Sequence, residues 1–165
     1  MIDYNKIKET LRAVIWNDLG CFFVDLENGD PRPDNQDDID TFISHKFTSP
    51  YIPQKGYEAN NADDLNYVTH PTMTLSLTVY SSSKGDALNK AHQLKQWFAF
   101  HGYEYLKENE LIIVSTSAIQ DRTTFLETRY DNRVGFDATI RVVDQEVREI
   151  DLISKVDLNK EQIGE

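Results

Sequence analysis

Two segments alternate apolar and polar residues so regularly that they constrain the fold more than any other feature. In residues 72–80 every second residue is apolar, and residues 134–142 repeat the pattern. A period of two places successive side chains on opposite faces of a strand, so each segment predicts a strand with one buried face and one solvent face. Half-buried strands of this kind are typical of antiparallel sheets. The alternating apolar residues are Met73, Leu75, Leu77, Val79, Val134, Phe136, Ala138, Ile140 and Val142.

Two other segments place apolar residues at helical spacing. Residues 3–18 form the first predicted helix, which Asp3 can cap and Gly20 can end. The second predicted helix begins after Ser83, in the position of an N-cap, and ends at Gly102, in the position of a C′ glycine. The predicted inner faces carry Ile7, Leu11, Val14 and Ile15 in the first helix, and Ala87, Leu88, Ala91, Leu94, Lys95, Phe98 and His101 in the second.

Shorter segments complete the predicted order of elements. Residues 21–24, 41–48 and 111–115 favour strands, with a short helix from Asp37 as the alternative for the second of these. Residues 49–53 are expected to bend or end their strand, and residues 56–67 to form a loop or a hairpin tip. Residues 150–158 suggest a further strand that turns near residues 144–146.

Together these elements predict an α+β fold. We expect an antiparallel β-sheet with two α-helices packed on one face and long acidic loops. A chain of 165 residues has room for one core, so residues 1–158 are expected to form a single domain. Residues 159–165 are expected to form a polar C-terminal tail.

The charge of the chain is strongly negative, with 28 acidic and 17 basic residues and a formal net charge of -11. Affinity for nucleic acid comes largely from lysine and arginine, so a phosphate-binding groove is not expected. Most of the excess lies in residues 25–64, a section that holds ten acids and three bases, and all five prolines lie in residues 31–71. The single cysteine, Cys21, excludes an internal disulfide, and no segment predicts a membrane span or a secretory signal.

A search for catalytic and binding motifs finds none. The four histidines have no metal-ligand spacing, and phosphate-binding loops and nucleophile elbows are absent. Asp34, Gln36, Asp38 and Asp40 alternate as in a calcium loop, but the central glycine and the final glutamate are missing. The sequence therefore predicts a protein with no metal, no cofactor and no enzymatic activity.

One charged segment, residues 121–137, is a candidate contact surface. Arginine forms specific paired contacts with carboxylates, and interface centres favour arginine and aromatic residues. The alternative is a solvated strand face with ordinary surface ion pairs. The candidate subunit-interface residues are Asp121, Arg122, Arg129, Tyr130, Asp131, Arg133 and Asp137, with Arg141 beyond the segment.

Several parts of the sequence resemble the neck and tail terminator proteins of long-tailed bacteriophages. The resemblance spans roughly residues 5–157 and includes the Arg32-Pro33 loop, SPYIP at residues 49–53 and residues 81–98. Its most specific parts are IQDRT at residues 119–123 and YDNRVGFD at residues 130–137. Residues 34–40 and the C-terminal tail match least.

The resemblance implies a structural protein of the virion. Such proteins form a ring, commonly a hexamer, at the head-proximal end of the tail tube, where they stop tube polymerisation and present a surface to the head connector. It places residues 121–137 in the subunit-contact region. The implied partners are other copies of the chain, the tail tube protein and the head-tail connector or adaptor protein, with no membrane. The implied location is the virion neck, after assembly in the host cytoplasm.

Loops and charge complete this expectation. Candidate contacts with the tube or the connector are Arg32, Asp34, Asp37, Asp38, Tyr57, Asp63 and Asp64. Acidic residues facing a ring's channel would repel phosphates, so genomic DNA would pass through without specific binding. A small acidic protein-binding module that mimics DNA and inhibits a basic protein is the alternative function.

Overall fold

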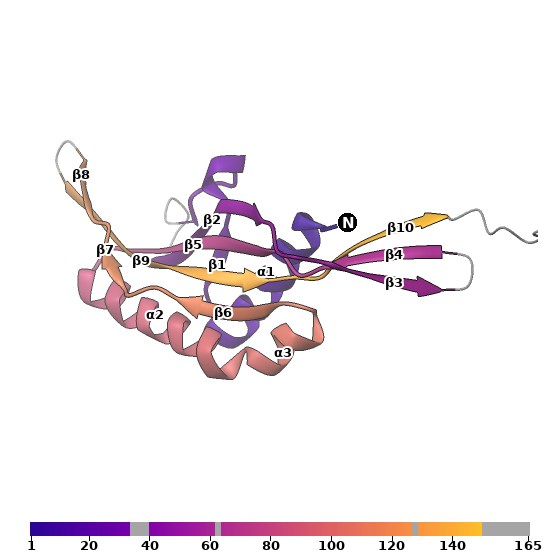
Figure 1. Cartoon of the computed structure of the whole chain (residues 1–165). Helices are drawn as coiled ribbons and strands as arrows, with labels where there is room; N and C mark the ends of the chain where they lie inside the picture. The colour runs from indigo at the N-terminus through magenta and orange to yellow at the C-terminus, as the bar shows by residue number, and fades with distance from the viewer. Residues whose placement is uncertain (34–39, 62–63, 127–128, 150–165) are drawn as a thin grey trace, which may run out of the picture.

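The main body of the protein is a β-sheet that is mostly antiparallel. The computed structural model describes residues 1–33, 40–61, 64–126 and 129–149 (Figure 1). Within these residues the strand order is β1-β2-β5-β9-β6, and two short strands pair along β9. Only β1 and β2 run parallel among the described pairs. The strands are β1 (Phe22–Val24), β2 (Thr41–Ile52), β5 (Thr72–Ser81), β6 (Ile112–Thr116), β7 (Gln120–Asp121), β8 (Thr124–Leu126) and β9 (Arg129–Arg141).

Helices cover one face of this sheet and enclose the hydrophobic core. They are α1 (Tyr4–Leu19), α2 (Lys84–Gln96), a π-helical segment (Trp97–His101) and α3 (Tyr103–Glu108). The alternating apolar residues of β5 and β9 are all buried in one cluster with α1 and α2, as their period of two predicts. The predicted α+β class is therefore confirmed.

The beginnings of both long helices are as predicted. The Asp3 side chain accepts a hydrogen bond from the Lys6 backbone N–H at 3.0 Å, and Gly20 ends α1 with a left-handed φ of 60°. The Ser83 side chain accepts from the Asp86 backbone N–H at the start of α2. Each cap satisfies a backbone group that has no partner within the helix.

The end of the second helix differs from the prediction. Gly102 has a φ of -86°, so it is not a left-handed C′ glycine, and the chain continues into α3. The Trp97 ring packs so closely on Gly102 that a Cβ there would overlap it. The intervening π turn rotates later residues around the axis. His101 is consequently exposed and does not lie on the inner face. Leu88, which precedes the π turn in α2, is exposed as well, whereas Trp97 is buried.

Strand β2 also differs, because it continues through Pro50 to Ile52. Its register with β5 shifts between Phe47 and Ser49 and again between Ser49 and Ile52. Strand β1 pairs only with residues 42–44, so this part of β2 has no described strand on its other side. Proline is tolerated at such an edge, where no ladder donor is needed.

A second sheet, which we call the arm, consists of β3 (Tyr57–Asn61), β4 (Asp64–Thr69) and β10 (Asp144–Glu149) in the order β10-β4-β3. Figure 1 shows the arm extending from the body beyond α3. Residues 56–67 thus form a hairpin and not a plain loop, and residues 144–146 lie in a strand and not in the predicted turn. The predicted strand at 150–158 and the predicted tail at 159–165 lie outside the described residues.

Candidate assembly surfaces

A cluster of arginines, aromatic rings and one buried carboxylate lies on the sheet face opposite the helices. Asp131 accepts hydrogen bonds from both Arg32 guanidinium NH2 groups at 3.3 Å, and from Arg133 at 2.8 and 2.7 Å. The guanidinium carbons of the two arginines each lie 5.1 Å from the Tyr80 ring centroid. That ring stacks on Phe42 with centroids 4.7 Å apart. Below, we call these five residues the arginine cluster.

Electrostatics hold the cluster's carboxylate in its charged form. Burial alone would raise the pKa of Asp131, but hydrogen bonds from Arg32 and Arg133 outweigh it and lower that pKa below its ordinary value. The cluster therefore joins the loop before β2 to the distal end of β9 by a charged, partly desolvated contact.

A third arginine, Arg122, lies across the same sheet face. Arg122 donates to Asp137 at 2.9 Å, to Ser76 at 2.8 Å and to Thr78 at 3.0 Å. Burial raises the pKa of Asp137, and hydrogen bonds from Ser76 and Arg122 lower it, with a net lowering. Gly135 makes this arrangement possible, because an added Cβ would lie 2.9 Å from an Arg122 nitrogen and would overlap a backbone oxygen of β5. Arg122 thus holds the chain after β7 against the sheet.

An exposed ion pair links the same region to α2. Asp121 pairs with Lys84, and its carboxylate also accepts from the Thr123 backbone N–H at 3.1 Å. These hydrogen bonds lower the pKa of Asp121 to about 2, the largest contribution coming from Lys84. The pair lies where β7 approaches the start of α2.

The structure brings most of the predicted interface residues together, but through contacts within one subunit. Asp121, Arg122, Asp131, Arg133 and Asp137 have the partners described above, so their role between subunits remains a prediction. Arg129 and Tyr130 lie in β9, but their side chains are not described. Arg141 lies ten residues from Asp131 along β9, roughly 33 Å away at the usual rise of a strand.

The predicted loop contacts are divided among several places. Arg32 belongs to the arginine cluster, whereas the Tyr57 side chain lies on the arm and is 56% exposed. Asp64 begins β4, but its side chain is not described. Asp34, Asp37, Asp38 and Asp63 lie outside the described residues.

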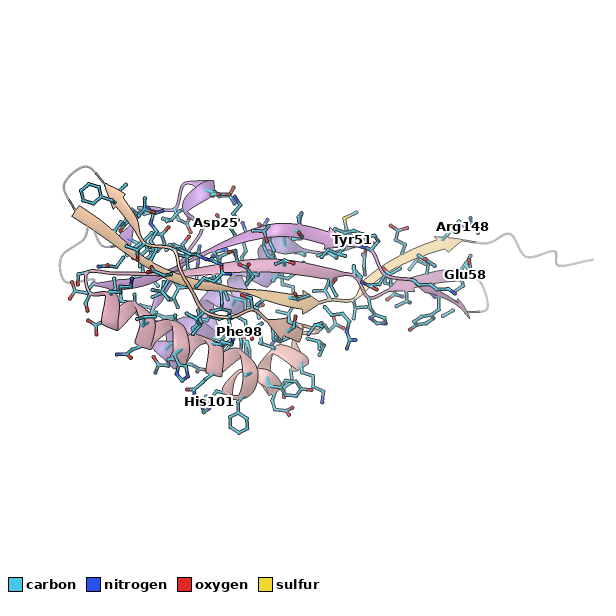
Figure 2. The ribbon with its side chains drawn as sticks, turned by 60° about the vertical axis from the view of Figure 1, so that its left-hand side comes forward. Asp25, Tyr51, Glu58, Phe98, His101 and Arg148 are labelled. Carbon is cyan, nitrogen blue, oxygen red and sulfur yellow. The ribbon has the colours of Figure 1, made fainter. Side chains whose placement is uncertain are left out.

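Sequence reasoning missed two projecting elements. The hairpin of β8 and β9 extends from one end of the sheet and carries Phe125, 59% exposed, beside exposed Leu126 (Figure 1). The arm extends from the other end, and Val147 on it is also 59% exposed. Figure 2 shows side chains along both faces of the arm, where none of the described helices covers them. Large exposed apolar residues on projecting strands favour contacts with other proteins.

A buried polar group near α1 was also missed by the sequence analysis. His45 is buried and stacks on Phe23 with centroids 4.1 Å apart, and burial lowers its pKa to about 4. Its Nε2 lies 3.9 Å from Asp25, which in turn accepts from Lys8 at 2.5 Å. In the described part of the chain, no three histidine, cysteine, aspartate or glutamate residues are grouped to hold a metal ion. No described helix is both long and apolar enough to cross a membrane.

These features define an α+β domain with exposed apolar residues on two projecting β-elements as well as on the body. A family model described as phage neck terminator protein matches residues 5–164 of the chain. The protein therefore belongs to the phage neck terminator family, which confirms the resemblance noted in the sequence. It is a structural component of the virion and associates with other head and tail components. No curated protein sequence matches the chain.

Proposed function

We propose that the protein assembles into a homo-oligomeric ring, a hexamer, at the head-proximal end of the tail. There it ends polymerisation of the tail tube and joins the tail to the head connector. The observation that carries this proposal is the position of the two projecting elements at opposite ends of one long sheet. A joining protein needs two separate contact surfaces, one for each neighbour along the tail axis.

The projecting arm supports this role because few of its described side chains are buried. Three strands are independently stable only with a hydrophobic face or a packed helix. Asn66 and Thr69 are the buried side chains described on the arm, whereas Tyr57, Tyr67 and Val147 are exposed. We infer that the arm becomes fully packed only against the tube or the connector.

Charge pairing argues against the DNA-mimic alternative. A DNA mimic presents rows of carboxylates that no base within the protein neutralises. In the described residues, many carboxylates are already paired: Asp25 with Lys8, Asp30 with Arg12, Glu27 with Lys46, Asp121 with Lys84, Asp131 with Arg32 and Arg133, and Asp137 with Arg122. The net charge of -11 instead supports a channel that DNA traverses without specific binding.

Labelling of isolated tails tests this position directly. An antibody against the chain should mark one point, the head-proximal end, in electron micrographs. Label distributed along the tube would contradict the proposal. In solution, a hexameric ring would weigh about 115 kDa, six times the 19.1 kDa of one chain.

A further inference from the structure

An apolar groove lies beside β1, at the C-terminal half of α1. It has a volume of about 380 Å³ and is lined mainly by Trp16, Phe22, Phe23, Pro31 and Pro33. The Trp16 and Phe22 rings are tilted by 52° with centroids 4.7 Å apart, and Trp16 is 49% exposed. Grooves lined by aromatic rings bind proline-containing segments in several peptide-recognition domains.

The groove offers side chains rather than a free strand edge. Arg12 donates to the backbone carbonyl of Phe23 at 3.1 Å and to Asp30 at 2.7 Å. Asp30 in turn accepts from the Asp25 backbone N–H at 2.8 Å. Because this carbonyl of β1 is occupied, addition of another strand at β1 is disfavoured. A ligand would instead bind through its own side chains against the rings and prolines.

The chain contains a segment with matching chemistry. Residues 50–55 read Pro-Tyr-Ile-Pro-Gln-Lys, two prolines three positions apart followed by a lysine. Tyr51 is 45% exposed, and residues 52–55 are exposed as well. Their pairing with β5 is irregular, which leaves the segment extended but only partly bonded to the sheet. Extended segments with this proline spacing are typical ligands of aromatic grooves.

Charge favours the match between groove and segment. Residues 25–40, which include both groove prolines, contain seven acids and one arginine; Asp25, Glu27 and Asp30 of these are paired with Lys8, Lys46 and Arg12 within one copy. Residues 41–57 contain two lysines and no acid. Two copies of a chain with a net charge of -11 repel each other overall, so a contact between them must join regions of opposite local charge.

We propose that residues 50–55 of one copy dock in the Trp16 groove of the next copy. Pro50, Tyr51 and Pro53 would cover the aromatic rings, and Lys55 would approach Asp30, the acidic residue that lines the groove. Groove and segment occupy different places on the subunit, so the contact is heterologous and repeats until a ring closes. The inference rests on the proposed ring and specifies which surfaces form it.

Such a contact is weak when taken singly. Six residues in one groove bury far less than the ~1,200–2,000 Å² of a stable interface. In a closed ring each subunit is held by two such contacts, one with each neighbour. The contact that closes the ring forms within an already linked assembly, so it is intramolecular. We therefore expect weak association of free subunits, which chemical cross-linking can trap.

Cross-linking between two labelled chains tests the contact. One full-length chain carries Ala13→Cys, next to the groove on α1, and the other carries Gln54→Cys; both positions are exposed. The native Cys21 is buried, so wild-type protein serves as the background control. A short bis-maleimide should join the two different chains at least tenfold more than it joins either variant to itself.

A charge reversal identifies the chemistry of the contact. Lys55→Glu in the Gln54→Cys chain should lower the cross-linked product at least tenfold. Lys6→Glu, the same charge change at an exposed position of α1, should leave it within twofold. A product that Lys55→Glu leaves unchanged would overturn the proposal.

The outcomes separate this inference from the proposed function. A wild-type ring without the mixed product would overturn the groove contact and leave the ring in place. If neither a ring nor the mixed cross-linked product forms at any protein concentration, docking between copies is overturned. The tail-joining role would then be tested separately in the phage. In isolated virions, cross-linking of Ala13→Cys to a different protein would assign the groove to that protein and also overturn the inference.

Discussion

The guanidinium of Arg32 lies 3.3 Å from the carboxylate of Asp131, although 99 residues separate them in the sequence. The contact joins the loop before β2 to the end of β9 that continues into the projecting hairpin. Arg133 donates to the same carboxylate, so one buried acid holds two cations. The geometry of the hairpin therefore depends on Asp131.

Removal of that carboxylate should destabilise the fold. Asp131→Asn leaves two arginines without their charged acceptor, and hydrogen bonds to charged groups contribute about 1.5–3 kcal/mol. We expect the free energy of unfolding at pH 7 to fall by about 2–3 kcal/mol. Urea unfolding of variant and wild type measures the difference.

The difference in free energy of unfolding between wild type and Asp131→Asn should depend on pH, and the sign of this dependence follows from the pKa of Asp131. The pKa of Asp131 is lower in the folded protein than in the unfolded chain, so the carboxylate stabilises the fold above its unfolded pKa of about 3.9. This stabilisation is lost as the pH falls through the lowered pKa. The difference between wild type and Asp131→Asn should therefore shrink below about pH 4, whereas an equal difference at pH 7 and pH 3 would contradict the charge-based explanation.

Gly135 should tolerate no side chain. An alanine Cβ there would overlap a β5 backbone oxygen and displace Arg122, and overpacking of this kind costs about 1–3 kcal/mol. Gly85→Ala is the matched control, because its nearest contact would be Ser83 at 3.7 Å within α2, where alanine favours the helix by up to about 1 kcal/mol. Unfolding free energies that change equally in both variants would refute the packing explanation.

His45 should make the protein sensitive to mild acid. Its pKa of about 4 lies below the unfolded value of about 6.5, so protons bind the unfolded chain more readily as the pH falls. Between pH 6.5 and pH 4 this costs about 3 kcal/mol of stability. His45→Phe should remove most of that loss, as measured by urea unfolding at several pH values. A loss of the same size in the variant would mean that other groups cause it.

The projecting hairpin should matter for assembly and not for folding. Leu126→Ser changes an exposed side chain, so the free energy of unfolding should move by less than about 0.5 kcal/mol. Phage carrying the variant should nevertheless yield fewer joined particles. The comparison variant is Arg133→Glu, which breaks the arginine cluster and should lower stability as well as assembly. A destabilised Leu126→Ser protein would show that the hairpin has an internal packing role.

Sequence patterns predicted the body of the fold better than its extensions. Strands β5 and β9 have one buried face, so their apolar residues recur with a period of two. The arm has no comparable pattern, because no described helix covers either of its faces and apolar residues such as Tyr57 and Val147 are exposed. The π turn at Trp97 likewise has no periodic signature, although it decides which side chains enter the core.

The candidate surfaces were only partly predictable for a related reason. Arginines and aromatic residues in 121–137 indicated a specific contact region, but spacing alone does not distinguish partners within a chain from partners between chains. The contact of Arg32 with Asp131 spans most of the chain, and no local pattern records it. The groove could have been suspected from Trp16 and Phe22, which are large aromatic residues next to a turn.

Measurement of tail lengths in a phage that lacks this protein tests the central claim most directly. The gene is interrupted in the parent phage, and tails from infected cells are measured by electron microscopy, with the wild-type chain supplied in trans as the control. The proposed function predicts tails of uncontrolled length, or tails of normal length that fail to join heads, with normal particles restored by the control. Normal virions without the protein would contradict it.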